Sequence, residues 1–211
     1  ISKADKLTQD ACSPRFVRTN HSDAMDLAMI NEWAKTIPGN NFAIMAADYV
    51  WGQDSAKSFE AAVTGQGKKV GTKLFVPLGT KDYAPYIQQL KNAKADAIWV
   101  ADVSGAIAFT KQAADFGLIP QTPLIGHALL SNFIVNATGN ALTNVPGNVG
   151  YTRDIDTPQS KAFAAAFKAR HNRLPSDTEG QAYNGTMVLL QGVKLAGSTK
   201  PLDVTKALRG A

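Results

Sequence analysis

Residues 42–52, FAIMAADYVWG, are the most informative segment of this sequence. Residues 42–47 form an unbroken apolar run, without the polar alternation of a strand that has one face in water. Such a run is typical of a parallel strand covered on both faces. Asp48 ends the run, and Gly52 leads into a helix expected to begin near Gln53. The segment therefore predicts a buried strand, a short loop and a helix.

The loop after this strand carries a carboxylate and two large rings. Asp48 supplies the carboxylate, and Tyr49 and Trp51 supply the rings. In open α/β sheets, small ligands bind in the crevice outside the carboxyl ends of the strands. We therefore predict a small-molecule site at this loop, with Trp51 as an aromatic wall. The alternative is a ring that only covers the protein surface.

Short apolar segments alternate with helical patterns up to about residue 140. The expected strands are 42–47, 70–75, 97–100 and 123–126. The expected helices are 24–36, 53–65, 83–93, one that opens at 102–105 and ends at Gly117, and one that opens near Ser131. Strands that alternate with helices at this spacing need crossover connections, which make the sheet parallel. We predict an α/β fold with a parallel sheet and helices on both faces.

The pattern changes after Gly139, where the sequence predicts helices without strands. These helices cover about 158–171 and 178–196, and a last one begins near Leu202. Because helices must bury their apolar faces, we expect them to pack on a sheet that other residues supply. We place a domain boundary near 149–153. The chain opens without Met and stops inside an expected helix, so we interpret it as a piece of a longer protein.

Composition indicates a folded globular protein. The chain has 211 residues, of which 45% are hydrophobic, enough for one or two domains. No apolar stretch approaches the ~20 residues of a transmembrane helix, and we find no signal peptide at Ile1. The 22 Lys and Arg residues exceed the 17 Asp and Glu residues, but the basic residues are scattered. Nucleic-acid binding, which needs a clustered basic surface, is therefore not indicated.

The residues that usually carry catalysis or bind metals are not arranged for either role. His21, His127 and His171 are far apart and lack metal-ligand spacing. No glycine-rich nucleotide or phosphate loop follows a strand, so no cofactor is predicted. Cys12, the single cysteine, is either a free thiol or half of a disulfide whose partner lies outside this sequence. We predict no catalytic residue and no metal site.

Several fragments, taken in order, resemble the extracellular solute-binding proteins of ABC transporters of the branched-chain amino-acid type. Each fragment is short, but their combined order is specific and covers essentially the whole chain. The fragments are LT at 7–8, CSP at 12–14, FVRT at 16–19, DYVWGQ at 48–53, KQAADFGL at 111–118, LPSD at 174–177, QAY at 181–183 and AGST at 196–199.

The resemblance implies a periplasmic-binding fold of type I, in which two α/β lobes joined by a hinge close on a ligand. On that template, residues 1–12 are the end of the N-terminal lobe and the hinge, 13–150 form the C-terminal-type α/β lobe, and 151–211 return into the N-terminal lobe as helices. The rest of the N-terminal lobe is expected upstream of Ile1. The family is periplasmic and delivers its ligand to a membrane permease of an ABC transporter, so the resemblance implies the same location and partner here.

The resemblance also implies which residues meet the ligand. Trp51 matches an aromatic residue that precedes glycine in the family's strand-to-helix loop and lies against the apolar part of the ligand. Asp102, Val103 and Ser104 match the turn after the third strand, where the N-terminus of a helix faces the cleft. Asp102 would repel a carboxylate there but could accept a hydroxyl or an ammonium group. Its alternative role is to cap the helix.

The turn after the fourth strand departs from the family pattern. Amino-acid binders usually place an acidic residue two positions after the glycine of this turn, where it pairs with the ligand's ammonium group. This chain has Gly126-His127-Ala128 instead. An unpaired buried charge costs about 3–5 kcal/mol, so we predict a small carboxylate without an amino group, such as an aromatic or hydroxy acid. His127 and Ala128 are then at the ligand, with His127 as a hydrogen-bond donor.

Three other functions stay open. The ligand could be a branched-chain or other amino acid, within the same family. A ligand-sensing domain of a transcription regulator or receptor shares this fold. An enzyme would need Asp48 and Asp102 as an acid/base pair across the edge of the sheet. We predict a binding protein and not an enzyme.

Overall fold

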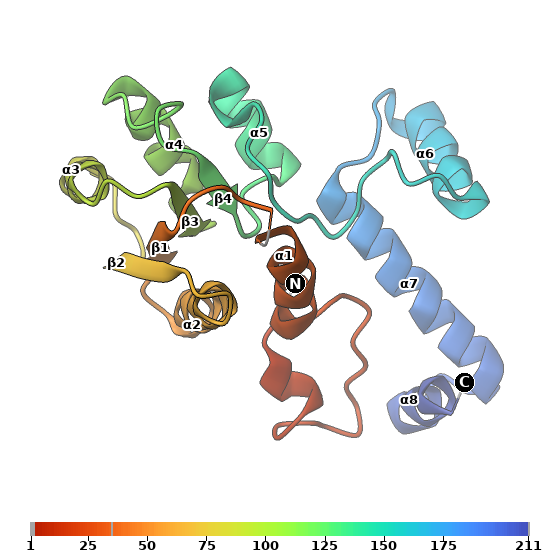
Figure 1. Cartoon of the computed structure of the whole chain (residues 1–211). Helices are drawn as coiled ribbons and strands as arrows, with labels where there is room; N and C mark the ends of the chain where they lie inside the picture. Colours follow the sequence, from red (N-terminus) through yellow and green to blue (C-terminus); the bar gives the residue numbers. More distant parts are fainter. Residues whose placement is uncertain (1–2, 35, 211) are drawn as a thin grey trace. The chain divides into compact units, whose positions relative to one another are not determined.

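Strand β1 (Asn41–Ala47) lies inside the sheet and is buried on both faces. The side chains of residues 42–47 are at most 1% exposed. β1 pairs in parallel with β2 (Lys69–Val76) on one side and with β3 (Ala97–Ala101) on the other, and β4 (Leu124–Gly126) pairs in parallel with β3. The strand order is β2-β1-β3-β4 (Figure 1). The predicted α/β fold with a parallel sheet is confirmed.

The computed structural model describes residues 3–34 and 36–210. Its α-helices are α1 (Asp23–Ala34), α2 (Val50–Thr64), α3 (Ala84–Asn92), α4 (Ala106–Asp115), α5 (Asn132–Thr138), α6 (Pro158–His171), α7 (Asp177–Ala196) and α8 (Pro201–Arg209), and two short 3-10 helices are η1 (Asp5–Thr8) and η2 (Gly139–Leu142). The expected first helix runs on to Thr36, but α1 is described only to Ala34, and Lys35 lies outside the described residues. None of the helices described here combines the length and the apolar character needed to cross a membrane.

The chain forms two units, and each is described by itself. The sheet unit is Asp23–Val149, and the helical unit combines Ile1–Ser22 with Gly150–Ala211. The second boundary between the units, at 149/150, lies one residue from the predicted boundary at 150/151. The first, at 22/23, lies ten residues beyond the predicted boundary at 12/13. The assignment of these segments to two lobes of a larger fold stays a prediction, because the units are defined by packing within this chain.

Helices cover both faces of the sheet (Figure 1). On one face, α3 and α4 contribute Leu90 and Phe109 to a buried cluster with the strands. On the other face, α1 and α2 contribute Leu27 and Phe59 to a second cluster. The Phe59 ring stacks on that of Trp99 from β3, with 4.5 Å between centroids and 9° between planes. Both faces of β1 and β3 are therefore closed to water, as the apolar run predicted.

Helix α2 begins closer to β1 than the sequence indicated. It starts at Val50 and not near Gln53, so Trp51 lies in its first turn and not in a loop. Gly52 makes this start feasible, because a Cβ atom at this position would lie 2.0 Å from the carbonyl oxygen of Ala47. Backbone meets backbone at this point, and no side chain fits between them.

Replacing Gly52 with alanine should lower the free energy of unfolding by at least ~2 kcal/mol, because the added methyl group forces β1 and α2 apart. Gly65→Ala at the C-cap of the same helix is the matched control. There the new Cβ would lie 3.1 Å from the carbonyl oxygen of Ala61, and φ of −61° suits any residue. Urea denaturation followed by circular dichroism measures both variants. A Gly52→Ala protein as stable as the wild type would contradict the close approach.

In the helical unit, α8 is bound to the segment that precedes the sheet unit. The hydroxyl of Thr205 donates to the carbonyl oxygen of Pro14 at 2.7 Å. The guanidinium of Arg209 donates to the carbonyl oxygens of Ser13 at 2.6 Å and Phe16 at 3.0 Å. These bonds join parts of the chain that are 191 to 196 positions apart. The N-terminal segment and the last helix therefore form one body.

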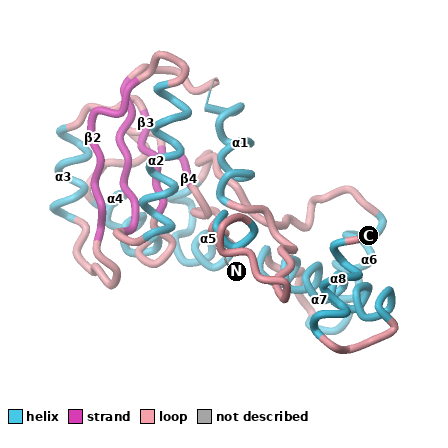
Figure 2. The backbone as a smooth tube through the Cα atoms, turned by 90° about the horizontal axis from the view of Figure 1, so that it is seen from below, coloured by secondary structure: helices cyan, strands magenta, loops and turns pink. Residues whose placement is uncertain are grey.

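The helical unit has no strand among its described residues (Figure 2). It exposes large apolar side chains, which are Ile155, Leu174, Tyr183, Met187, Leu189, Leu190, Leu195 and Leu202. Large exposed apolar patches usually mark an interface. Packing of these helices on a sheet supplied by other residues stays a prediction.

The N-terminus of α7 is capped through Glu179. The Ser176 hydroxyl accepts the N–H of Glu179, and the Glu179 carboxylate accepts the N–H of Ser176 at 2.8 Å. Arg173 holds the same carboxylate, with Nη1 donating at 2.9 Å. The hydrogen bonds from Arg173 lower the pKa of Glu179 to about 2. The carboxylate is therefore ionised at neutral pH and stabilises the start of α7.

Replacing Glu179 with glutamine should destabilise the protein in a pH-dependent way. The folded pKa of about 2 is lower than the ~4.3 of an unfolded chain. The ionised carboxylate therefore stabilises the folded state at pH 7, and this contribution is lost as the pH falls below about 4.5. The stability gap between wild type and Glu179→Gln should shrink in thermal melts from pH 7 to pH 3.

The control for this experiment is Glu60→Gln. A salt bridge of 2.9 Å joins Glu60 to Lys73, but their side chains are 34% and 44% exposed. Such surface pairs contribute little. A gap for Glu179→Gln that stays constant with pH would show that the carboxylate charge does not stabilise α7.

Candidate functional site

The carboxyl ends of β1, β3 and β4 meet at one edge of the sheet. Ala46 on β1 lies opposite Ala101 on β3, and Val100 on β3 lies opposite Gly126 on β4. All the predicted site residues follow these strand ends, so the fold brings them to the same edge. They are Asp48, Tyr49 and Trp51 after β1, Asp102, Val103 and Ser104 after β3, and His127 and Ala128 after β4. This edge belongs entirely to the sheet unit.

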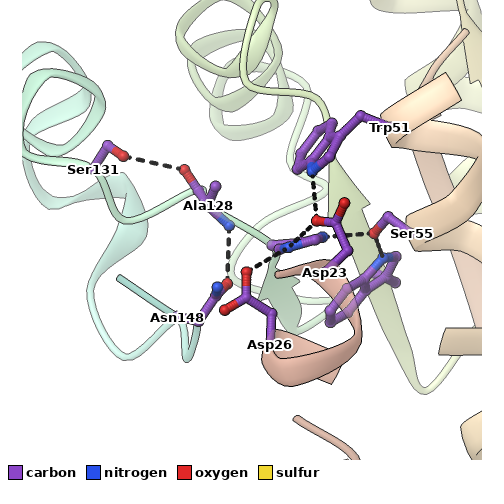
Figure 3. A network of polar contacts seen from close by, with 9 residues as sticks. Asp23, Asp26, Trp51, Ser55, Ala128, Ser131 and Asn148 are labelled. Carbon is purple, nitrogen blue, oxygen red and sulfur yellow. Dashed lines mark hydrogen bonds and ion pairs between the residues drawn. The ribbon is translucent and has the colours of Figure 1, made fainter. Parts of the chain in front are cut away.

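Tyr49 and Trp51 form an aromatic wall at this edge. Tyr49 precedes α2 with an extended backbone, and its ring stacks on that of Trp51, with 6.0 Å between centroids and 29° between planes. The indole N–H of Trp51 donates to Oδ1 of Asp23 at 3.0 Å (Figure 3). Tyr49 is 40% exposed and Trp51 is partly buried. The pair therefore offers an accessible aromatic surface whose orientation is held by a hydrogen bond.

The electrostatic character of this edge is negative. Partial burial and the nearby carboxylates of Asp102 and Asp23 raise the pKa of the Tyr49 hydroxyl. Tyr49 is therefore neutral at physiological pH and can donate a hydrogen bond. Asp48 adds an exposed carboxylate, whose Oδ1 accepts a hydrogen bond from Gln53 at 2.9 Å. A ligand meets hydrogen-bond acceptors and a ring here, and a negative group on the ligand would be repelled.

Asp102 organises the turn between β3 and α4. It is 3% exposed, and its Oδ2 accepts the hydroxyl of Tyr83 at 2.6 Å. Its Oδ1 accepts the hydroxyl of Ser104 at 2.8 Å and the N–H of Gly105 at 3.0 Å. These bonds lie within the turn that precedes α4, and none of them caps the helix itself, whose N-cap residue is Gly105. Since three donors already occupy the carboxylate, its role as a ligand contact stays a prediction.

This turn also explains where α4 begins. The helix starts at Ala106 and not within 102–105, because the Asp102 carboxylate holds those residues in a turn. A Cβ atom on Gly105 would lie 1.5 Å from the Tyr83 hydroxyl, so the turn requires glycine. Burial and the bond to Asp102 raise the pKa of Tyr83, which remains the donor. Val103 is half-buried and Ser104 is exposed at this edge.

His127 lies behind the aromatic wall, within the protein. It is 1% exposed, and its ring centroid is 4.8 Å from that of Trp51. Nδ1 lies 2.7 Å from Oγ of Ser55, and Nε2 lies 3.2 Å from Oδ2 of Asp26. The sequence predicted His127 as a hydrogen-bond donor to the ligand, whereas in this structure both ring nitrogens face protein groups. Nε2 also lies 3.7 Å from Oδ1 of Asp23, and Figure 3 labels Asp23, Asp26 and Ser55.

Ala128 has its backbone N–H bound to a protein side chain. It has a positive φ of 60°, and its N–H donates to Oδ1 of Asn148 at 3.1 Å. Asn148 is 3% exposed, and its Nδ2 finds no acceptor among the described residues. The side chain of Ala128 is a methyl group and adds no charge. The place at which family members carry an acidic residue is therefore apolar.

Asp23, Asp26 and Ser55 are residues of the site that sequence reasoning missed. The sequence analysis assigned none of the three to the site. A signal was present, because Asp23 and Asp26 share a helical stripe with Leu27 and Ile30, at the spacing that faces the core. Both carboxylates are buried, at 3% and 1% exposure. Acidic residues inside an apolar stripe indicate buried polar partners.

Asp23, Asp26 and His127 also form a constellation of metal-ligand type. One potential ligand atom from each lies within 4.8 Å of the other two. Imidazole nitrogen combined with carboxylate oxygen suits divalent transition metals. The hydrogen bond between Nε2 and Asp26 already joins two of these groups. The histidine spacing gave no hint of this arrangement, because its carboxylates come from a helix about 100 positions away.

The whole chain is similar to known proteins. Residues 1–211 match the family model described as periplasmic binding protein. The Leu/Ile/Val-binding protein homolog 6 of Brucella melitensis is 28% identical over 203 residues, which cover 93% of this chain and 51% of that protein. The chain therefore spans about half the length of this curated relative.

Solved structures match as well. An ABC transporter substrate-binding protein from Sphaerobacter thermophilus has a TM-score of 0.85 at 27% identity, over 99% of this chain and 59% of that chain. A solute-binding protein of an ABC transporter from Rhodopseudomonas palustris BisB5, in complex with 3,4-dihydroxybenzoic acid, has a TM-score of 0.81 at 26% identity, over 97% and 57%. The family model matches the chain from end to end and the fold agrees, so this chain belongs to the periplasmic binding protein family.

Proposed function

We propose that this chain is part of the periplasmic substrate-binding component of an ABC transporter that captures a small aromatic carboxylate. The observation that carries the proposal is the accessible stack of Tyr49 and Trp51 at the carboxyl ends of the strands. A ligand ring placed on this surface gains apolar burial and ring stacking. The related protein with 3,4-dihydroxybenzoic acid supports a ligand of this class.

The negative charge of the edge determines how such a ligand is oriented. Asp48 and Asp102 are carboxylates, and Asp23 lies behind Trp51. Like charges repel strongly where water is excluded. The acid group of the ligand therefore points away from this edge, and its ring lies on it. We propose that the other lobe of the binding protein, formed with residues outside this sequence, holds the acid group.

An α-amino acid fits this edge less well. The position at which amino-acid binders of the family carry an acidic residue is Ala128, whose methyl group offers no partner for an ammonium group. Of the other groups at this edge, Asp102 and His127 are already bound to protein side chains, and the exposed Asp48 accepts a hydrogen bond from Gln53. A branched-chain amino acid remains the second candidate, because the curated relatives are named as Leu/Ile/Val-binding protein homologs.

Binding and release would follow from closure of two lobes. A ligand that contacts both lobes stabilises the closed state by its difference in affinity for the two states. The closed protein would then dock on a membrane permease.

Asp48 bonds to Gln53 and Asp102 bonds to three protein donors, so we propose that the pair serves structure and recognition and does not act in acid/base catalysis.

The proposal predicts that Trp51→Ala weakens binding of benzoate about 30-fold in the protein that contains this chain. This corresponds to the loss of ~2 kcal/mol of ring burial. Isothermal titration calorimetry measures the affinities. Phe116→Ala is the matched control, because Phe116 is another aromatic residue of the sheet unit, 50% exposed, at the opposite end of α4.

Two outcomes would contradict the proposal in different ways. Unchanged benzoate affinity in Trp51→Ala would show that the ring does not touch the ligand. Tight binding of L-leucine together with no binding of benzoate or 3,4-dihydroxybenzoate would favour the branched-chain alternative.

A further inference from the structure

The ring of His127 is the centre of a chain of buried hydrogen bonds that joins four elements of the sheet unit. Trp99 on β3 donates from Nε1 to Oγ of Ser55 on α2 at 3.1 Å. Ser55 meets Nδ1 of His127 at 2.7 Å, and Nε2 of His127 meets Asp26 on α1 at 3.2 Å. Asp23, one turn earlier on α1, accepts the indole N–H of Trp51. The hydrogen-bond chain therefore runs from Trp99 to Asp26, and Asp23 lies beside it, with Oδ1 3.7 Å from Nε2 of His127.

The chemistry of the partners fixes the direction of these bonds. An indole N–H can only donate, so Ser55 accepts from Trp99. A carboxylate can only accept, so Nε2 of His127 carries a hydrogen toward Asp26. Nδ1 faces the Ser55 hydroxyl, which can act as donor or acceptor toward it. Because both ring nitrogens are engaged, the imidazole cannot rotate or flip without breaking bonds to both neighbours.

The imidazole also supports the indole of Trp51 from behind. The two rings are 4.8 Å apart between centroids, with 39° between their planes. Nε2 lies 3.7 Å from the same Asp23 oxygen that holds the Trp51 N–H. The tilted ring contact and the shared carboxylate together restrict the Trp51 side chain in the first turn of α2. His127 itself is 1% exposed and presents no nitrogen to the edge.

We propose that His127 is a positioning residue that determines ligand affinity through the orientation of Trp51, without touching the ligand. This inference rests on the proposed function, in which Trp51 forms the ligand wall. It gives His127 a different role from that of a hydrogen-bond donor to the ligand. Ser55 and Asp26 fix the imidazole, and the imidazole and Asp23 fix the indole. Recognition at the wall therefore depends on residues that lie behind it.

A double-mutant cycle tests this role in the protein that contains this chain, with benzoate and L-leucine as probes. His127→Leu removes both hydrogen bonds, whereas His127→Gln keeps an amide donor for Asp26. We expect His127→Leu to weaken binding about tenfold and His127→Gln to weaken it less. In the Trp51→Ala background, the same substitutions should change affinity less than about twofold. A tenfold loss that persists in the Trp51→Ala background would show direct contact with the ligand and overturn the proposal.

A control separates positioning from loss of stability. Leu124→Ala removes a buried side chain from β4, the strand that precedes His127, but Leu124 belongs to the core on the other face of the sheet. It should lower the melting temperature as much as His127→Leu and leave ligand affinity unchanged. Equal losses of affinity in both variants would mean that His127 acts only through stability.

The orientation of Trp51 can also be measured without a ligand. The contribution of Trp51 to the near-ultraviolet circular dichroism spectrum is the difference between wild type and Trp51→Phe. This signal should be retained in His127→Gln and Leu124→Ala and lost in His127→Leu. An unchanged signal in His127→Leu would overturn the proposal even if neither probe binds. Failure of both probes to bind would instead count against the proposed ligand class alone.

Discussion

Burial of β1 on both faces is the constraint on which the rest of this structure depends. A strand that sits between β2 and β3 and under helices on both sides has only its ends open to solvent. Polar and functional residues must therefore follow the strand and cannot alternate along it. The close approach of α2 to the end of β1, which Gly52 permits, then places Trp51 directly at the edge of the sheet. The position of the aromatic wall follows from the packing of the core.

The same edge combines an apolar surface with several carboxylates, and each carboxylate has its own structural task. Asp102 accepts the N–H of Gly105 in the turn before α4, and Asp23 accepts the indole N–H of Trp51. Asp26 orients His127. Burying an acidic group costs free energy unless the group is paired, and each of these carboxylates has a hydrogen-bond donor nearby. Together they make the edge suited to a ring or a donor and unsuited to an anion, which is why we assign the ligand's acid group to the other lobe.

The helical unit has the opposite character. Side chains cap α6 and α7, and Thr205 and Arg209 join α8 to the N-terminal segment, yet large apolar side chains remain exposed along α7. Local hydrogen bonding explains why these helices form. The chain spans about half the length of a curated relative, and packing of these helices on a sheet stays a prediction.

Much of this could be predicted from the sequence by itself. Apolar runs and helical spacing predicted the four parallel strands and the alternating helices, because those patterns report local backbone preference and burial. The end of the first strand also predicted a site at Tyr49 and Trp51, and the family resemblance implied that Asp102 and His127 lie at the same ligand. Motif order predicted the family, which the match over the full chain confirms.

Only the tertiary structure showed what each of these side chains contacts. Asp26 and His127 are 101 positions apart, and Ser55 and His127 are 72 apart. No local pattern in the sequence specifies that such groups will share a hydrogen bond. The sequence therefore determined which residues follow the strand ends, where we place the candidate site, because strand ends are a local property. The role of His127 depended on the fold, because hydrogen-bond partners are chosen by packing between elements that are distant in the chain.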